Sequence, residues 1–223
     1  HYKFKTKPYE HQLEALEKSW AQDTYALFME MGTGKSKVLV DNIAMLCDKG
    51  AIRGALIVAP KGVYKNWNDI EFPVHLPDHV NHTKVLWDPS ITKKKQMELD
   101  TLFDGGEDLK ILIMNVEAFS TKKGLDFAYS FLNIFLGRAL IGIDESTTIK
   151  SPTAKRTKNI LKIGELAKYR RILTGSPVTK SPLDLYTQCK FLDPFYLDEA
   201  SYYSFRARYP NMVKRNFGGR SVQ

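Results

Sequence analysis

A glycine-containing loop constrains this chain more than any other stretch. The loop, residues 29–36, reads Met-Glu-Met-Gly-Thr-Gly-Lys-Ser. It follows the apolar run 25–28, which predicts a strand, and precedes residues 38–47, whose apolar spacing predicts a buried helix. A strand, a glycine loop, Gly-Lys-Ser and a helix form the context that a phosphate-binding loop requires. The chain is therefore predicted to fold around an anion site at the start of that helix.

The residue types in this loop have chemical reasons to be there. Glycines let backbone N–H groups turn toward phosphate oxygens, and the helix N-terminus adds its positive dipole end. Lys35 is placed to reach β- and γ-phosphates, and Ser36 to hold Mg²⁺ through its hydroxyl. The predicted nucleotide-binding residues of the loop are Met31, Gly32, Thr33, Gly34, Lys35 and Ser36. Met29 occupies the first glycine position of the usual pattern, so an ordinary glycine turn is the alternative interpretation.

A second informative stretch is an apolar strand, residues 138–145, that ends in the adjacent carboxylates Asp144 and Glu145. In a P-loop ATPase the first carboxylate orients Mg²⁺ and its waters, and the second can act as base for the attacking water. We therefore predict Lys35, Asp144 and Glu145 as catalytic residues. Ser36 and Asp144 are the predicted Mg²⁺ ligands. A chance acidic turn after a strand is the alternative.

Strand patterns alternate with helix patterns along the chain, which predicts one α/β domain with a mostly parallel central sheet. Strands are predicted at 25–28, 54–60, 80–87, 109–115, 138–145 and 170–177. Helices are predicted at 38–47, 92–103, 125–136 and 183–192, with another that opens near residues 7–12. Ser151 is predicted to cap a further helix, with Pro152 at its first position.

The charge balance favours a polyanionic partner, since the net charge is +8 and the pI is near 9.3. Lys61 and Lys65 follow a predicted central strand, where ligands bind in open α/β sheets. They suit phosphate-backbone contact, or simply a solvated helix start. Residues 205–223 lack acidic side chains and mix basic with aromatic residues, which suits nucleic acid or a partly disordered basic tail.

Several classes of protein are not expected. The sequence has no apolar run of about 18 residues that could span a membrane and no apolar N-terminal signal region, so an intracellular location, cytoplasmic or nucleic-acid-associated, is predicted. Cys47 and Cys189 are far apart in apolar contexts and are predicted to be reduced core thiols. Two prolines break the segment that carries His75, His79 and His82, so zinc is not expected.

Taken together, these stretches resemble the N-terminal RecA-like lobe of superfamily 2 helicases, specifically the Swi/Snf-like double-stranded DNA translocases. The resemblance covers roughly residues 9–194, in the order of the family's motifs. The matching segments are 9–12 (Q motif), 30–36 (motif I), 58–72 (motif Ia), 113–119 (motif Ib), 144–151 (motif II) and 173–177 (motif III). The resemblance implies a RecA-like P-loop NTPase lobe with helices on both faces of the sheet.

The resemblance also implies cofactors, partners and residue roles. ATP and Mg²⁺ are the implied cofactors, and DNA contacted through its backbone is the implied partner. Gln12, which could otherwise be a solvent-facing helix residue, would read adenine through its amide. Nucleic acid would contact Lys61, Lys65, Asn115 and Lys150. Coupling between the nucleotide site and motif III would involve Thr147, Thr174, Gly175 and Ser176, with Thr147 standing where the family usually has His.

The family has a second RecA-like lobe that supplies arginine fingers and half of the DNA track, and nothing after residue 194 resembles it. The expected organisation is an ATP-binding lobe at 1–194 and a basic extension at 195–223 that leads toward the second lobe. A lone lobe is expected to bind ATP but hydrolyse it weakly. Three alternatives stay open: an RNA-acting helicase or restriction-complex motor, a non-catalytic nucleic-acid-binding regulatory lobe, and a P-loop kinase of small molecules.

Overall fold

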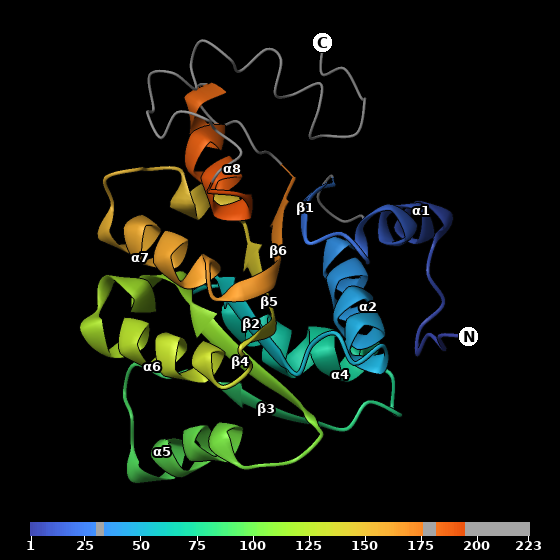
Figure 1. Ribbon diagram of the computed structural model, residues 1–223, viewed down its shortest axis with the longest axis horizontal. Coiled ribbons are helices and arrows are strands. Elements are labelled where there is room, and N and C mark those ends of the chain that lie inside the picture. The colour runs from blue at the N-terminus through green and yellow to red at the C-terminus, as the bar shows by residue number, and fades with distance from the viewer. Residues whose placement is uncertain (30–33, 176–181, 195–223) are drawn as a thin grey trace.

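The computed structural model describes residues 1–29, 34–175 and 182–194 (Figure 1). Within these residues, six strands form one sheet in the order β1-β6-β5-β2-β4-β3, and every pairing is parallel. The strands are β1 (Thr24–Phe28), β2 (Gly54–Ala59), β3 (His82–Leu86), β4 (Leu109–Asn115), β5 (Gly137–Asp144) and β6 (Ala167–Thr174). The predicted α/β class with a mostly parallel sheet is confirmed.

Helices follow the strands in the predicted alternation. They are α1 (Glu10–Ser19), α2 (Lys35–Asp48), α3 (Tyr64–Asn66), α4 (Phe72–His75), α5 (Lys93–Asp100), α6 (Lys122–Asn133), α7 (Lys155–Gly164) and α8 (Tyr186–Leu192). No helix within the described ranges is both long enough and apolar enough to cross a bilayer.

The predicted start of α7 is wrong. Ser151 does not cap this helix, because α7 begins at Lys155 after Ala154, whose backbone is extended and which offers no side-chain cap. A 3-10 turn, Ser146–Ile149, occupies the chain directly after β5. The Ser151 hydroxyl lies 3.5 Å from the Thr153 hydroxyl, and the Ser151 carbonyl accepts from the Ala154 N–H at 3.4 Å.

Helices cover both faces of the sheet, as expected (Figure 1). Alternate residues of β2 show why: Leu56 and Val58 pack in one apolar cluster with residues of α6 and α7, whereas Ala55 and Ile57 pack in the other with α2. Gly142 on β5 allows α2 to approach closely, since a Cβ there would lie 2.7 Å from Leu39 Cδ2. This packing brings the start of α2 toward the end of β5.

A fully buried arginine, Arg171 on β6, fastens the end of α1 to the sheet. Its Nε donates to Asn42 Oδ1 at 2.9 Å, and its two Nη atoms donate to the carbonyls of Ser19 at 3.0 Å, Gln22 at 2.6 Å and Asp23 at 3.1 Å. Burial lowers the pKa of Arg171 to about 10, so the guanidinium stays charged at neutral pH. The carbonyl of Ser19 at the end of α1, and those of Gln22 and Asp23 in the turn after it, thereby receive donors.

Replacing this side chain should destabilise the lobe strongly. Arg171→Met keeps an apolar stem but leaves several buried carbonyls without donors, which should lower the free energy of unfolding by about 3–5 kcal/mol. Thermal and denaturant unfolding would measure the change. Lys168→Met on the same strand is the control, because Lys168 is exposed. Equal stabilities for the two variants would contradict this role.

The N-terminal residues hold α2 from its outer side. Tyr2 donates its hydroxyl to Asp41 Oδ1 at 2.7 Å, and the buried Lys37 donates to Asp41 Oδ2 at 2.7 Å. The Lys37 ammonium also lies 5.2 Å from the centroid of the Phe4 ring. Burial raises the pKa of Tyr2, so its hydroxyl stays protonated and keeps donating. The position of α2, and of the residues at its start, is therefore fixed from both sides.

Candidate functional site

The predicted catalytic residues meet at the carboxyl edge of the sheet. Lys35 is the first residue of α2, and Glu145 is the residue that follows β5. The Lys35 Nζ lies 3.7 Å from Glu145 Oε1. The Lys35 side chain is 12% exposed and the Glu145 side chain 40% exposed. The site is thus closed around Lys35, as suits a residue that holds a phosphate. It is open to solvent at Glu145, as suits a residue that contacts water.

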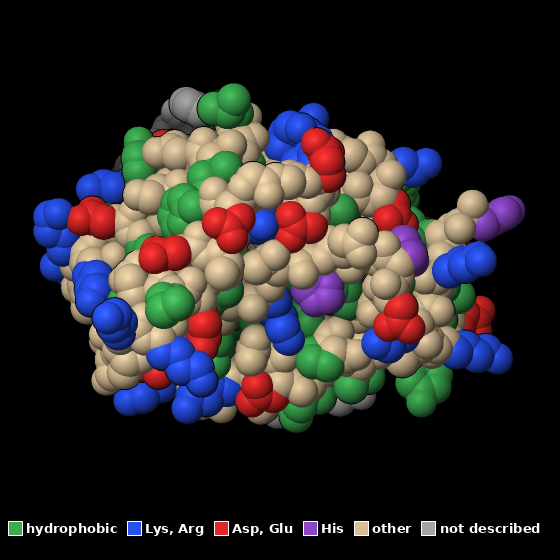
Figure 2. Space-filling model, turned by 90° about the horizontal axis from the view of Figure 1, so that it is seen from below, with side chains coloured by type: hydrophobic (Ala, Val, Ile, Leu, Met, Phe, Trp, Pro, Cys, Tyr) green, Lys and Arg blue, Asp and Glu red, His purple; other side chains and the backbone are tan. Residues whose placement is uncertain are grey.

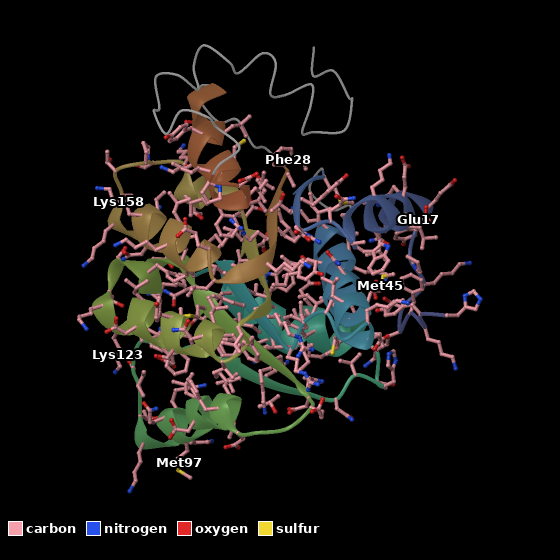
Figure 3. All side chains as sticks on the ribbon, viewed as in Figure 1. Glu17, Phe28, Met45, Met97, Lys123 and Lys158 are labelled. Carbon is pink, nitrogen blue, oxygen red and sulfur yellow. The ribbon has the colours of Figure 1, made fainter. Side chains whose placement is uncertain are left out.

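Neighbouring strands bring the predicted motifs together. Phe28 at the end of β1 pairs with Thr174 at the end of β6, and Leu173 pairs with Asp144 at the end of β5. The residues that follow these three strands therefore start from one edge. Phe28 is labelled at that edge in Figure 3.

Asp144 is buried, with 5% of its surface exposed, and both carboxylate oxygens accept hydrogen bonds. Oδ2 accepts from Trp67 Nε1 at 2.9 Å, and Oδ1 accepts from the Glu145 backbone N–H at 2.9 Å. Burial raises the pKa of Asp144 and the charge of Glu145 raises it further, while the Trp67 bond and Lys35 oppose the rise. A nearby cation would stabilise the ionised form of a carboxylate in this setting.

The donor set fits Mg²⁺. Carboxylate and hydroxyl oxygens are the ligands that this ion prefers, and each Asp144 oxygen has lone pairs beyond the bonds that it accepts. Ser36 follows Lys35 in the first turn of α2 and is half-buried. Asp144 and Ser36 are therefore suitable residues for the ion.

Glu145 has a backbone conformation that is costly for its residue type. Its φ is +50° and its ψ is +60°, in the left-handed region, where a non-glycine residue costs on the order of 1–3 kcal/mol. Leu136, in the turn before β5, shares a φ of +50°, so the angle alone does not mark a site. At Glu145 this conformation occurs together with a bond from its backbone N–H to Asp144 Oδ1 and with a side chain whose Oε1 lies 3.7 Å from Lys35 Nζ.

Gln12 is buried rather than solvent-facing, which removes that alternative. Its Oε1 accepts from the Tyr9 backbone N–H at 2.8 Å, and its Nε2 donates to the Gly34 carbonyl at 3.3 Å. Gly34 has a φ of +77°, and a Cβ at this position would lie 2.1 Å from Gln12 Nε2. Only glycine fits this contact between α1 and the end of the loop. Contact with adenine stays a prediction.

The remaining site predictions are placed only in part. Met31, Gly32, Thr33 and Ser176 lie outside the described residues. Thr174 is buried at the end of β6, Gly175 is exposed after it, and Thr147 is half-buried in the turn after Glu145. Their role in coupling stays a prediction.

The structure adds a polar link that the sequence analysis missed. The buried Ser146 hydroxyl donates to Gln188 Oε1 on α8 at 2.5 Å, and Gln188 Nε2 donates to the Asp184 carbonyl at 2.8 Å. Thr187 donates to the Ile149 carbonyl. These bonds fasten the turn after Glu145 to α8. The available signal was the adjacent Thr-Gln pair in a helix that is otherwise apolar except for Lys190.

The predicted nucleic-acid residues differ in exposure. Lys61 and Lys65 are exposed beyond the end of β2, and Lys150 is half-buried. Asn115 is buried at the end of β4, where its Nδ2 donates to Glu117 Oε2 at 3.1 Å. Lys61 and Lys65 are therefore the more accessible pair.

Other basic side chains lie away from this edge or alternate with acidic ones. Lys123 on α6 and Lys158 on α7 point outward from the sheet (Figure 3). On the face in Figure 2, basic side chains are interspersed with acidic and apolar ones. The net charge of +8 therefore does not by itself locate a binding surface.

The histidines and cysteines have separate surroundings. His75 lies 2.8 Å from the Thr6 hydroxyl, and His79 lies 2.9 Å from Asp48. Within the described ranges no three His, Cys, Asp or Glu side chains form a group suited to a metal ion. Both cysteines are free, and burial raises the pKa of Cys189 to about 12, which makes it an unreactive core thiol.

In this parallel sheet the first strand, β1, leads in the sequence through a glycine loop to Gly-Lys-Ser, and β5, the third strand in sheet order, is followed by the pair Asp144-Glu145. Together these features define a RecA-like P-loop lobe. The sequence matches the SNF2-related domain over residues 11–220. The chain belongs to this family.

Similar proteins agree with this assignment. The chain is 31% identical over 196 residues to an Arabidopsis thaliana protein named "Probable ATP-dependent DNA helicase CHR23", an alignment that covers 82% of this chain and 16% of that protein. It is 27% identical over 214 residues to the chromatin-remodeling ATPase INO80 of Aspergillus oryzae, covering 87% of this chain and 13% of that protein. The chain thus spans less than a fifth of the length of these relatives.

The fold also matches a solved structure, the Sulfolobus solfataricus SWI2/SNF2 ATPase core in complex with double-stranded DNA. The TM-score is 0.70 and the sequence identity 21%, and the match covers 96% of this chain and 42% of that one. This likeness confirms the predicted RecA-like lobe with helices on both faces of the sheet.

Proposed function

We propose that this chain is the ATP-binding lobe of a DNA-dependent ATPase that uses Mg²⁺ and ATP hydrolysis to move along duplex DNA. The observation that carries the proposal is the meeting of Lys35 and Glu145, 3.7 Å apart, beside the buried Asp144. These are the residue types that phosphate binding, water activation and metal binding require. The lobe would comprise residues 1–194, with 195–223 leading toward a second lobe.

The chemistry follows from these positions. Lys35 and the N–H groups at the start of α2 hold the β- and γ-phosphates. The Lys35–Glu145 separation is long for an ion pair, so the ammonium can turn to a phosphate oxygen without losing a short bond. Ser36 and Asp144 would hold Mg²⁺, which would supply positive charge to offset the negative charge of the phosphate oxygens. Glu145 accepts a proton from the attacking water and orients it.

Duplex DNA is favoured as the partner by two observations. Lys61 and Lys65 are exposed beyond the same sheet edge as the proposed ATP site. The names of the relatives include a DNA helicase and a chromatin-remodeling ATPase, and the similar structure contains double-stranded DNA. Contacts from lysines to phosphates carry no sequence information, so binding should be sequence-independent and salt-dependent.

The alternatives differ in what they require. A non-catalytic regulatory lobe would not need Lys35, Asp144 and Glu145 together, and a small-molecule kinase would not need exposed lysines at this edge. An RNA helicase or a restriction-complex motor would have the same ATP site as the proposed ATPase. These candidates are distinguished by which nucleic acid stimulates ATP hydrolysis.

The test is ATP hydrolysis by the intact protein with double-stranded DNA, single-stranded DNA or RNA. Duplex DNA should stimulate most, and the Lys61→Gln, Lys65→Gln double variant should need more DNA for half-maximal stimulation. Lys49→Gln is the control, since Lys49 is exposed after the far end of α2. Strongest stimulation by RNA would support the RNA helicase instead. ATP binding without stimulation by any nucleic acid would support the regulatory lobe.

A further inference from the structure

The helical segment after β2 contains an irregular turn whose cause is visible in the sequence. Between α3 and α4, residues Trp67–Glu71 form a π-helical turn, in which the Phe72 N–H bonds to the Trp67 carbonyl. Pro73 follows, which has no N–H to donate and whose ring would clash with the carbonyl four residues earlier. The wider turn avoids that clash, and Lys84 on β3 donates to the Asn68 carbonyl. Such turns are frequent at functional sites.

This turn places one indole against the proposed metal carboxylate. Trp67 is 1% exposed, and its Nε1 donates to Asp144 Oδ2 at 2.9 Å. The Phe72 ring packs 5.8 Å from the Trp67 ring, centroid to centroid. Trp67 thus packs against Phe72 of its own helical segment and donates a hydrogen bond to Asp144, 77 positions away in the sequence.

The same segment carries the exposed lysines. Lys65 precedes Trp67 by two residues and faces solvent, and Lys61 lies in the loop before α3. A shift of this segment when the lysines contact DNA would move the indole relative to Asp144. The segment therefore connects the proposed DNA contact to the proposed metal site without using Thr147.

We propose that Trp67 is a positioning residue that fixes the Asp144 carboxylate for Mg²⁺ and couples DNA contact at Lys61 and Lys65 to that carboxylate. The inference rests on the function proposed above. The bonds from Trp67 and the Glu145 backbone fix the rotation of the carboxylate, one on each oxygen, and leave each oxygen with acceptor capacity for a cation. Partners that orient a metal ligand in this way typically contribute about 10–100-fold to metal affinity or activity.

The test removes the indole N–H and keeps the ring. Benzothienylalanine, a tryptophan isostere with sulfur in place of N–H, is introduced at Trp67 in the intact protein, and at Trp87 as the matched control. Trp87 is 3% exposed and packs against Phe127. The readout is the Mg²⁺ concentration that gives half-maximal binding of a fluorescent ATP analogue, with and without duplex DNA, a measurement that needs no turnover.

The isostere at Trp67 should raise the required Mg²⁺ concentration about 10-fold and remove the effect of DNA on it, whereas the isostere at Trp87 should change neither. Thermal unfolding of both proteins checks that packing is preserved, and Trp67→Phe should give the same shift as the isostere. An unchanged Mg²⁺ requirement at Trp67, in a protein whose ATPase still responds to duplex DNA, overturns this inference alone. If the unmodified protein binds no ATP analogue, both this inference and the proposed function fail.

Discussion

Glu145→Gln is expected to abolish ATP turnover while leaving ATP binding intact. The amide keeps the size of the side chain but cannot accept a proton from water, and removing a general base typically costs about 10²–10⁴-fold in rate. Steady-state hydrolysis by the intact protein at saturating duplex DNA measures the loss. Binding of a fluorescent ATP analogue measures what is kept.

The geometry indicates that the Glu145→Gln variant keeps the proposed Mg²⁺ ligand Asp144 in place. The charge of Glu145 is one of the causes that raise the pKa of Asp144, so its removal lowers that pKa and favours the ionised carboxylate. The bond from the residue 145 backbone N–H to Asp144 Oδ1 does not depend on the side chain. Weaker Mg²⁺-dependent ATP binding in Glu145→Gln would therefore show that Glu145 is itself a metal ligand.

Glu165→Gln is the matched control, because Glu165 is exposed at the end of α7. This variant should hydrolyse ATP at the unmodified rate. Turnover within a few-fold of normal in Glu145→Gln would exclude Glu145 as the base.

The sequence predicts the local elements of this lobe well, for physical reasons. Residues 55–59 of β2, 111–114 of β4 and 139–143 of β5 carry no charged or polar side chain, because helices cover both faces of each strand. The Gly-Lys-Ser loop and the Asp144-Glu145 pair are also local features. Because parallel strands end at one edge, Lys35 after β1 and Glu145 after β5 are expected at the same edge of the sheet, although the insertion of β6 between these strands is not a local feature.

The contacts that fix these residues depend on distant parts of the chain. Trp67 is typical of a buried helix position, and nothing in its neighbourhood indicates that its N–H reaches Asp144. Arg171 in the sequence is an ordinary basic residue before an apolar run, yet it is fully buried and donates to Asn42 on α2, Ser19 at the end of α1 and Gln22 after it. Such partners are set by the tertiary packing of β5, β6 and α1, which residue periodicity does not describe.

Ser151 and Gln12 show two further ways in which a local pattern misleads. Ser-Pro is a common helix start, but the turn directly after Glu145 uses the preceding residues and moves the start of α7 to Lys155. Gln12 lies on a helix with charged neighbours, yet it is buried where Gly34 at the end of the loop approaches it, a contact that the helix pattern does not show.

Residues 1–223 alone are expected to bind ATP but to hydrolyse it about 10³–10⁵-fold more slowly than the intact protein with duplex DNA, the range that an arginine finger contributes in related chemistry. Lys35 supplies positive charge from this lobe, but Arg170 and Arg171 are turned away, donating to the carbonyls of Phe191 and Ser19. The Glu145 side chain is 40% exposed, leaving the water side of the site open. A second lobe would close it and add the missing cation.

Single-turnover hydrolysis at low protein concentration measures the deficit, with intact Glu145→Gln protein as the blank. Adding an intact Lys35→Ala variant supplies a second lobe whose own ATP site is disabled, so any recovery of turnover would come from residues acting on this lobe in trans. Brisk hydrolysis by residues 1–223 without that addition would show that the catalytic set is complete within this chain, and that the stimulation expected from duplex DNA acts through Lys61, Lys65 and Trp67 rather than through lobe closure.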